Sequence, residues 1–146
     1  SVSVEFVLLF PVLFLILYGL ITYALIFSAQ HTLSLAAAEG GRAALRYQRA
    51  DTADEALALR AAAAQSAAGQ SLNWLRNIAG VDAVSVPLPV AQACASDAAL
   101  RCLQVSVTYD YQAAPLVPRL LGPLSLPTPA RLSSEAVVQI GPMQLL

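Results

Sequence analysis

Residues 1–27 read SVSVEFVLLFPVLFLILYGLITYALIF, and this stretch decides how the rest of the chain must be organised. After Glu5, the segment from Phe6 to Phe27 carries no charged side chain, and Thr22 is its one strongly hydrophilic residue. As an α-helix it would be roughly 33 Å long, enough to cross a hydrocarbon core of about 30 Å. The stretch therefore predicts a membrane span, or a helix that is shielded from water by packing against the same helix in other copies of the chain.

The apolar segment does not have the pattern of a cleavable secretory signal. No Lys or Arg precedes it, its apolar core is too long, and the first basic residue is Arg42. A chain that starts at Ser1 without Met is expected to be already processed, with any cationic leader removed.

The next residues, SAQHTLSLAAAEGGRAALRYQR, keep a helical propensity. One helix from about Val2 to Arg49, roughly 70 Å long, is expected, with bends at Pro11 and at Gly40–Gly41. A helix of that length cannot be buried in a domain of about a hundred residues. We expect an apolar membrane or filament-core helix at 1–27, a continuation at 28–50 that links it to the head, and a globular head at 51–146.

The head begins with a second helix in TADEALALRAAAAQSAAGQSLNWLRNIAG. Thr52 and Glu55 form a capping-box pattern at its start, and Gly80 fits its end. Four bulky residues near that end are expected to pack on a sheet: Leu72, Trp74, Leu75 and Ile78.

Three segments have the alternation of strands. In VDAVSVPLPV the alternating residues are Val84, Val86, Leu88 and Val90, although Pro87 and Pro89 indicate an edge. RCLQVSVTYDY places Leu103, Val105, Val107, Tyr109 and Tyr111 on one face, and SEAVVQIG repeats the pattern with Ala136, Val138 and Ile140. The predicted fold class is α+β: a long N-terminal apolar helix, and a second helix packed on a small three-stranded antiparallel sheet.

The connection between the last two strands, residues 112–131, is rich in Pro and Leu: QAAPLVPRLLGPLSLPTPAR. An apolar, stiff loop is either a lid over its own sheet or a contact between subunits, and both alternatives stay open. The candidate residues for a contact between heads are Leu116, Leu120, Leu121 and Leu124.

Composition argues against catalysis, nucleic-acid binding and metal binding. The net charge is −1, and all eight basic residues are Arg, so neither a Schiff-base lysine nor a phosphate-loop lysine is present. No basic block suggests nucleic acid. His31 lies three residues from Ser28 and from Ser34, but no acid is nearby to orient the ring. With one His and no Cys-x-x-Cys motif we expect no zinc site, no cofactor and no enzyme.

The two cysteines, Cys94 and Cys102, lie close together in ACASDAALRC. A disulfide closing a short loop is the favoured interpretation and indicates an oxidising compartment, and two free thiols are the alternative.

Glu5 also has two interpretations. It can be a helix-start carboxylate that is stabilised by the helix dipole. Alternatively, it can pair with the α-amino group of Ser1 on a neighbouring copy, since a charge in a dry environment is costly unless it is paired. Such a pairing would fix the axial offset between helices in a polymer.

These residues resemble a known family. Glu5 and Phe6 ahead of a long apolar helix resemble a mature type IV pilin. VEFVLLFPVLFLILYGLITYALIF followed by AAAEGGRAALR resembles more specifically the TadE-like proteins of tight-adherence pili. The later QVSVTYDYQAAPLVPRLLGPLSLPTPARLSSEAVVQI resembles the ending of that family.

The resemblance implies a non-enzymatic filament component with Ser1 as the new N-terminus and assembly residues Ser1, Glu5, Phe6 and Pro11. It implies three partners: further copies of the chain, a prepilin peptidase with the pilus assembly machinery, and the inner membrane before export to a surface pilus. The expected function is a pilin that polymerises through its N-terminal helix into an adhesive filament. The alternative is a membrane-anchored minor pilin or adaptor whose head binds a partner in a pilus or secretion machine.

Overall fold

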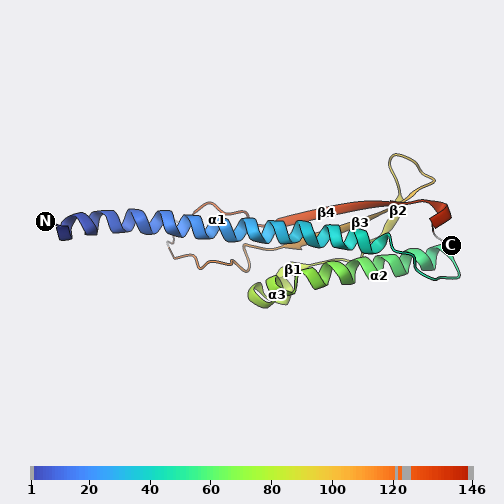
Figure 1. The fold of residues 1–146 in the computed structure, drawn as a ribbon, viewed down its shortest axis with the longest axis horizontal. Helices are drawn as coiled ribbons and strands as arrows, with labels where there is room; N and C mark the ends of the chain where they lie inside the picture. The colour runs from blue at the N-terminus through green and yellow to red at the C-terminus, as the bar shows by residue number, and fades with distance from the viewer. Residues whose placement is uncertain (1, 121, 123–125, 145–146) are drawn as a thin grey trace.

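The computed structural model describes residues 2–120, 122 and 126–144, except for the side chain of Val2. A long helix, a shorter antiparallel helix and a four-stranded sheet make up this part of the chain (Figure 1). The helices are α1 (Val2–Ala44), α2 (Ala53–Ser71) and α3 (Asn73–Ala79), with short 3-10 turns η1 (Val81–Ala83) and η3 (Pro142–Gln144). The strands are β1 (Val84–Ser85), β2 (Ala91–Ala93), β3 (Arg101–Tyr109) and β4 (Leu132–Ile140).

Helix α1 has 43 residues and is therefore roughly 65 Å long. Its first half extends beyond the rest of the molecule, and its second half lies against α2 and the sheet (Figure 1). The helix ends at Ala44 rather than at the predicted Arg49. It remains α-helical through Pro11, where a bend was predicted, because a proline removes only one hydrogen bond from a ladder that continues on both sides.

The helix also continues without a break through Gly40 and Gly41, where the second bend was predicted. The two glycines instead allow close packing. A Cβ at Gly40 would contact Val105 and the backbone of Ala64, and a Cβ at Gly41 would contact Val138. The two glycines therefore let α2, β3 and β4 approach α1 closely.

Strand β3 is the centre of the sheet. It pairs with β4 along its whole length, from Arg101 opposite Ile140 to Tyr109 opposite Leu132. Two short strands pair antiparallel with its other edge: β1 pairs near Tyr109, and β2 pairs near Leu103. The α+β fold class is confirmed, with four strands where three were predicted.

The fourth strand arises because the predicted first strand is interrupted. Val84 lies opposite Tyr109, whereas Ala91 lies opposite Leu103, so the segment between them holds one residue more than the facing stretch of β3. An extra residue moves every later side chain to the other face of a sheet. Leu88 and Val90, which were predicted to share a face with Val84, are accordingly 55% and 67% exposed.

The core lies between the sheet and the two long helices. β3 contributes four fully buried side chains, as its alternation predicted: Leu103, Val105, Val107 and Tyr109. α1 and α2 contribute mostly small residues to the same cluster: Ala29, Leu33, Ala36, Ala37, Ala44, Ala61, Ala64 and Ala68. Small side chains on facing helices allow both helices to lie close to one face of the sheet.

The predicted capping box at the start of α2 is present. The Thr52 hydroxyl accepts a hydrogen bond from the Glu55 N–H at 3.2 Å, and the Glu55 carboxylate accepts one from the Asp51 N–H at 3.1 Å. The predicted helix is broken at Leu72, where α2 ends and α3 begins. Leu72 and Leu75 are buried, as predicted. Ile78 was also predicted to pack on the sheet, but it lies on the solvent side of α3 and is 65% exposed.

The C-terminal end of α1 is held by a buried cation. Arg60 is 2% exposed, and its guanidinium donates to the Ala44 carbonyl at 3.3 Å and to the Gln144 carbonyl. A positive charge at a helix C-terminus interacts favourably with the helix dipole. Arg60 therefore connects α1, α2 and the last described residues of the chain.

Candidate functional site

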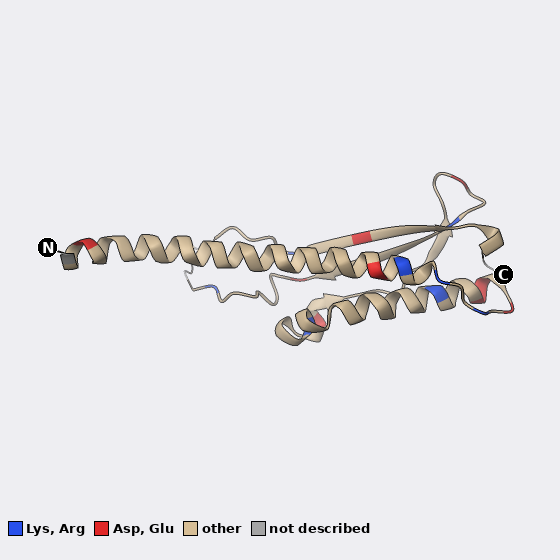
Figure 2. Ribbon diagram, in the orientation of Figure 1, with Lys and Arg blue, Asp and Glu red and all other residues tan. Residues whose placement is uncertain are grey.

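The first half of α1 is an exposed apolar surface. Every described side chain from Ser3 to Leu17 is exposed, and this helix alone, among the described helices, is long and apolar enough to cross a membrane. Glu5 is the only charged residue on this part of the helix, and the next is Glu39, in the packed second half of α1. Figure 2 accordingly shows one acidic residue near the N-terminal end of α1 and no other charge along its exposed half. An apolar surface of this size marks a site of contact with lipid or with other protein chains.

A row of aromatic rings runs along one side of this surface. Phe6, Phe10, Phe14 and Tyr18 follow one another at four-residue intervals, and their ring centroids are 5.6, 6.3 and 6.3 Å apart. Residues four apart lie one above the other on a helix, so the rings form a continuous stripe. Phe6 is 65% exposed and Phe14 is 39% exposed, so the stripe becomes less exposed toward the head.

The stripe ends where the proline-rich loop reaches α1. We call the two described limbs of this loop, residues 112–120 and 126–131, the collar. The Tyr18 hydroxyl donates to the Pro118 carbonyl in one limb, and the Tyr23 hydroxyl donates to the Pro127 carbonyl in the other, both at 2.8 Å. Five residues at about 100° each place the two tyrosines roughly 140° apart around the helix. The collar therefore holds α1 from two sides.

The loop was expected to cover its own sheet or to contact another head. Its described limbs pack on the middle of α1 rather than over the sheet (Figure 1). The contact with another head stays a prediction. Leu116 is half-buried against the core, whereas Leu120 is 63% exposed. The other two candidate contact residues, Leu121 and Leu124, lie outside the described residues.

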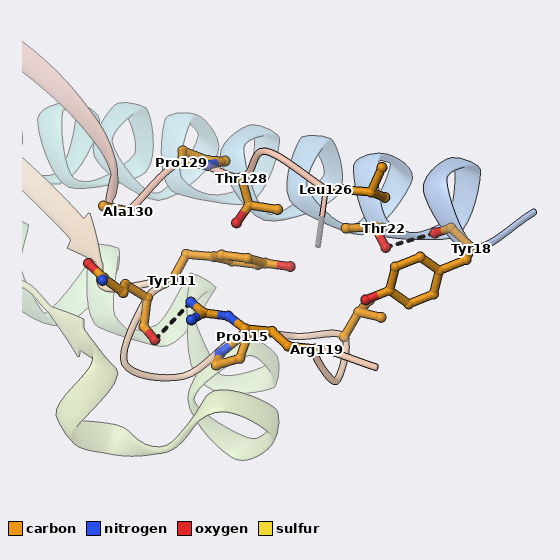
Figure 3. A pocket seen from close by; sticks show the side chains of 11 residues that line it. Tyr18, Thr22, Tyr111, Pro115, Arg119, Leu126, Thr128, Pro129 and Ala130 are labelled. Carbon is orange, nitrogen blue, oxygen red and sulfur yellow. Dashed lines mark hydrogen bonds between the residues drawn. The ribbon is translucent and has the colours of Figure 1, made fainter. Parts of the chain in front are cut away.

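A cavity of about 280 Å³ lies between the collar and α1 (Figure 3). Its wall includes Tyr18 and Thr22 from α1, Tyr111 just ahead of the loop, and Arg119 and Leu126 from the loop itself. Burial raises the pKa of Tyr111, with a smaller contribution from Tyr18. The Arg119 guanidinium donates to the Gln112 carbonyl at 3.4 Å, which ties one limb of the collar to its own start.

The predicted assembly residues lie at the exposed end of α1. Glu5 is in the first turn of the helix, Phe6 begins the aromatic stripe, and Pro11 is exposed one turn further on. Ser1 lies outside the described residues. Within the described part of the chain, Glu5 makes no ion pair, whereas Glu39 on the same helix pairs with Arg42 at 2.7 Å. Glu5 is thus a single acid on an otherwise uncharged surface.

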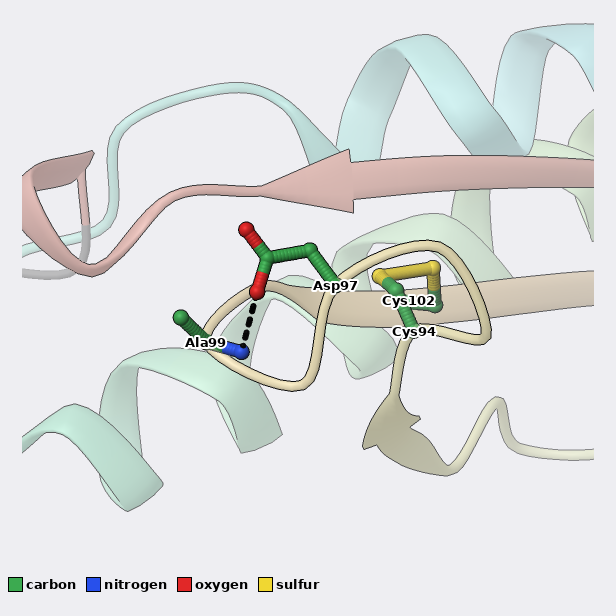
Figure 4. The surroundings of a disulfide bond; sticks show 4 residues. All are labelled: Cys94, Asp97, Ala99 and Cys102. Carbon is green, nitrogen blue, oxygen red and sulfur yellow. Dashed lines mark hydrogen bonds between the residues drawn. A yellow bond between two sulfur atoms is a disulfide. The ribbon is translucent and has the colours of Figure 1, made fainter.

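The two cysteines form a disulfide at the opposite end of the molecule (Figure 4). Cys94 follows β2, and Cys102 lies in β3 opposite Gln92. The intervening turn is also held by the Cys94 N–H, which donates to the Leu100 carbonyl at 3.1 Å, and by the Asp97 carboxylate, which accepts from the Ala99 N–H at 2.9 Å. The disulfide therefore closes the turn between two paired strands.

The possible catalytic group around His31 stays unassembled in the structure. His31 is exposed, and the Ser34 hydroxyl donates to the carbonyl of Gln30 in its own helix. Among the described residues, no group of three or more His, Cys, Asp or Glu side chains could hold a metal ion. The surface features that distinguish this protein are the apolar helix and the collar.

Sequence reasoning missed the contact between the collar and α1. The available signal was chemical: Tyr18 and Tyr23 carry hydroxyl donors inside an apolar segment, and the loop 112–131 is rich in prolines, whose carbonyls accept hydrogen bonds although they have no N–H. The tyrosine hydroxyls of the helix can therefore donate hydrogen bonds to loop carbonyls that few N–H groups of the loop itself can satisfy.

Comparison with known proteins gives one match. No curated protein and no solved structure matches the chain significantly. The family model described as TadE-like protein matches residues 1–53, which comprise α1 and the connection to α2. The predicted resemblance is therefore confirmed over residues 1–53, which are similar to TadE-like proteins and which we call the TadE-like segment. The resemblance predicted for residues 104–140 stays a prediction.

Proposed function

We propose that this protein is a structural pilin subunit that polymerises through the first half of α1 into an extracellular filament for surface attachment. The observation that carries the proposal is the division of α1. Its second half is packed against the head, while the described side chains before Tyr18 are exposed and, apart from Ser3 and Glu5, apolar. The TadE-like segment relates the chain to tight-adherence pili. Before assembly the apolar half would be held in the inner membrane, and prepilin peptidase and the pilus machinery would be its partners.

In this proposal Glu5 sets the position of one helix relative to the next. Its carboxylate would pair with the α-amino group of Ser1, on the same or a neighbouring subunit. Removing one partner of a buried ion pair leaves an uncompensated charge, at a cost of about 3–5 kcal/mol. Glu5 lies in the first turn of α1, and this end of the helix is remote from the head (Figure 1). Glu5 should consequently be needed for polymerisation rather than for folding of the head.

The test compares two acids on the same helix. Glu5→Ala and Glu39→Ala each remove one carboxylate from α1, but Glu39 lies in the second half of the helix and forms an exposed pair with Arg42. Exposed pairs contribute about 1 kcal/mol or less, so Glu39→Ala should leave filament yield unchanged. Glu5→Ala should abolish or strongly reduce the chain in the sheared surface fraction while its membrane pool stays at the wild-type level.

N-terminal sequencing of each variant is the necessary control, because it separates a defect in processing from a defect in polymerisation. Glu5→Gln should be intermediate at best, since it keeps a hydrogen-bond acceptor but loses the charge. A wild-type yield from correctly processed Glu5→Ala would contradict the proposal and reduce Glu5 to a helix-start residue.

A second candidate function is a membrane-anchored minor pilin or adaptor. The collar favours it, because the collar occupies two sides of α1 at Tyr18 and Tyr23 and leaves a shorter stretch free for packing between helices. A minor subunit needs few such contacts. Immunogold labelling of surface filaments distinguishes the two: labelling along the whole filament supports the polymer, whereas label at filament ends or only in membranes supports the minor component.

A further inference from the structure

The position of the collar limits how α1 can sit in a bilayer. The described helix residues ahead of the first collar contact, 2–17, amount to roughly 24 Å of helix at 1.5 Å per residue. A hydrocarbon core is about 30 Å thick. If α1 spans a membrane with the collar in place, the collar must lie at the outer boundary of that membrane or slightly within it.

The backbone of the collar is suited to a place with little water. An irregular segment in lipid is normally excluded because its N–H and C=O groups lack partners. Four residues of the described limbs, Pro115, Pro118, Pro127 and Pro129, have no N–H to satisfy. Two of the carbonyls, those of Pro118 and Pro127, accept hydrogen bonds from the tyrosine hydroxyls of α1.

The side chains of the collar fit the boundary between lipid and water. Leu120 and Pro118 are exposed, and Val117 and Leu126 are half-exposed, so the limbs present apolar surface. Arg119 is the only charged residue between Asp110 and Arg131. Tyrosine is enriched at membrane interfaces, and an Arg near the surface attracts anionic lipid headgroups while its stem lies along apolar groups.

We propose that the collar is a membrane-interface element, which rests in the outer headgroup region of an anionic bilayer while the chain is anchored through α1. Its apolar residues supplement the free part of α1, which is too short by itself to cross the hydrocarbon core. Arg119 is exposed and makes one long hydrogen bond, to the Gln112 carbonyl, so it supplies a positive charge close to the lipid phosphates. The inference rests on the membrane anchoring in the proposed function, and it adds the loop as a second, lipid-binding part of the anchor.

The test measures membrane depth with single tryptophans. The chain has one Trp, so Trp74→Phe gives a background without tryptophan. Three exposed positions then receive the reporter in separate full-length variants: Leu120→Trp in the collar, Leu13→Trp on the free part of α1, and Val137→Trp on the outer face of β4. Each variant is reconstituted in phosphatidylcholine–phosphatidylglycerol vesicles that carry bromine, a quencher of Trp fluorescence, at shallow or deep acyl positions.

We expect shallow bromines to quench the Leu120→Trp variant more strongly than deep ones, deep bromines to quench the Leu13→Trp variant, and neither to quench the Val137→Trp variant. If the Leu13→Trp variant is quenched while the Leu120→Trp variant is no more quenched than the Val137→Trp variant, the membrane role of the collar is overturned. Anchoring through α1 would still hold in that case. A blue shift of the collar reporter without quenching would mean contact with a second copy and would also overturn that role. Loss of quenching at the α1 reporter would overturn both the inference and the anchoring.

Discussion

Gly40 of α1 lies so close to Val105 of β3 that a Cβ at position 40 would be 2.8 Å from the Val105 Cγ1 atom. The same Cβ would be 3.0 Å from the carbonyl oxygen of Ala64 in α2. Because Val105 and Ala64 are fully buried, neither can move away without disturbing the core. The contact between α1, α2 and the sheet therefore depends on the absence of a side chain at this position.

Gly40→Ala should destabilise the head. Overpacking a core costs about 1–3 kcal/mol, and the gain of about 1 kcal/mol in helix propensity only partly offsets it. Gly69→Ala is the matched control, since position 69 also lies in a helix but a Cβ there would meet only the movable end of Arg76, at 3.3 Å. Thermal unfolding of the full chain in detergent should show a lower midpoint for Gly40→Ala and an unchanged or higher one for Gly69→Ala. Equal midpoints would contradict the packing argument.

Removing the disulfide should lower stability without changing the fold. Cys94 and Cys102 are eight residues apart, and closing a loop of that length contributes roughly 2–3 kcal/mol. The double variant Cys94→Ser, Cys102→Ser should therefore unfold at a lower temperature, as should the wild-type chain after reduction. Peptide maps of the native chain with and without reductant provide the check, because two thiols that alkylate before reduction would contradict the pairing.

Alkaline pH should weaken the core through Tyr109. Burial, and secondarily Tyr111 and Asp110, raise its pKa to about 12 from the ordinary value of 10.0. Above pH 10 the unfolded chain loses the phenolic proton while the folded chain keeps it, so this contribution to stability is complete below pH 10 and disappears as the pH rises toward 12. Tyr109→Phe removes the ionisable group and should make unfolding free energy less dependent on pH across this range.

Circular dichroism at a series of pH values measures this dependence. Tyr47→Phe is the control, because Tyr47 is 68% exposed and its substitution should leave the pH profile unchanged. A Tyr109→Phe profile as steep as that of the wild type would assign the alkaline transition to other groups, among which Tyr111 also has a raised pKa.

The features that depend on local pattern could be predicted from the sequence. The alternation through Val105 and Val107, and the capping pair of Thr52 and Glu55, are set by residues within a few positions of one another. The apolar character of the first helix follows from composition alone. These parts of the fold agree with the structure because no distant segment is needed to specify them.

The features that depend on distant partners could not be predicted. Gly40 was interpreted as a bend because glycine is a weak helix former. Its packing partners lie in α2 and β3 and cannot be identified from the neighbouring residues. Leu88 was assigned to the core face because the extra residue in the edge strand is visible only from its pairing with β3. Arg60 stands between Leu59 and Ala61 in an Ala-rich helix, and nothing beside it indicates that it binds the end of α1. In each case the partner is remote in the chain.

Loss of the two tyrosine hydroxyls should release the collar from α1. Tyr18→Phe and Tyr23→Phe each remove one hydrogen bond to a proline carbonyl, and a bond of this kind contributes about 0.5–1.5 kcal/mol. The ring and its apolar contacts stay, so the double variant should keep its fold and its melting temperature to within a few degrees. The limbs of the collar should nevertheless open more often, because the carbonyls of Pro118 and Pro127 lose their donors on α1.

Trypsin reports this opening directly, since the sequence contains no Lys and Arg119 is the only cleavage site between Arg101 and Arg131. Cleavage after Arg119 in the full chain should be faster in the double variant by a factor of up to about ten for each 1.4 kcal/mol of lost stabilisation. Tyr47→Phe, at an exposed position outside the collar, should cleave at the wild-type rate. Because the measurement follows one bond in one limb, equal rates in all three chains would mean that packing on α1, rather than the hydroxyls, holds the collar closed.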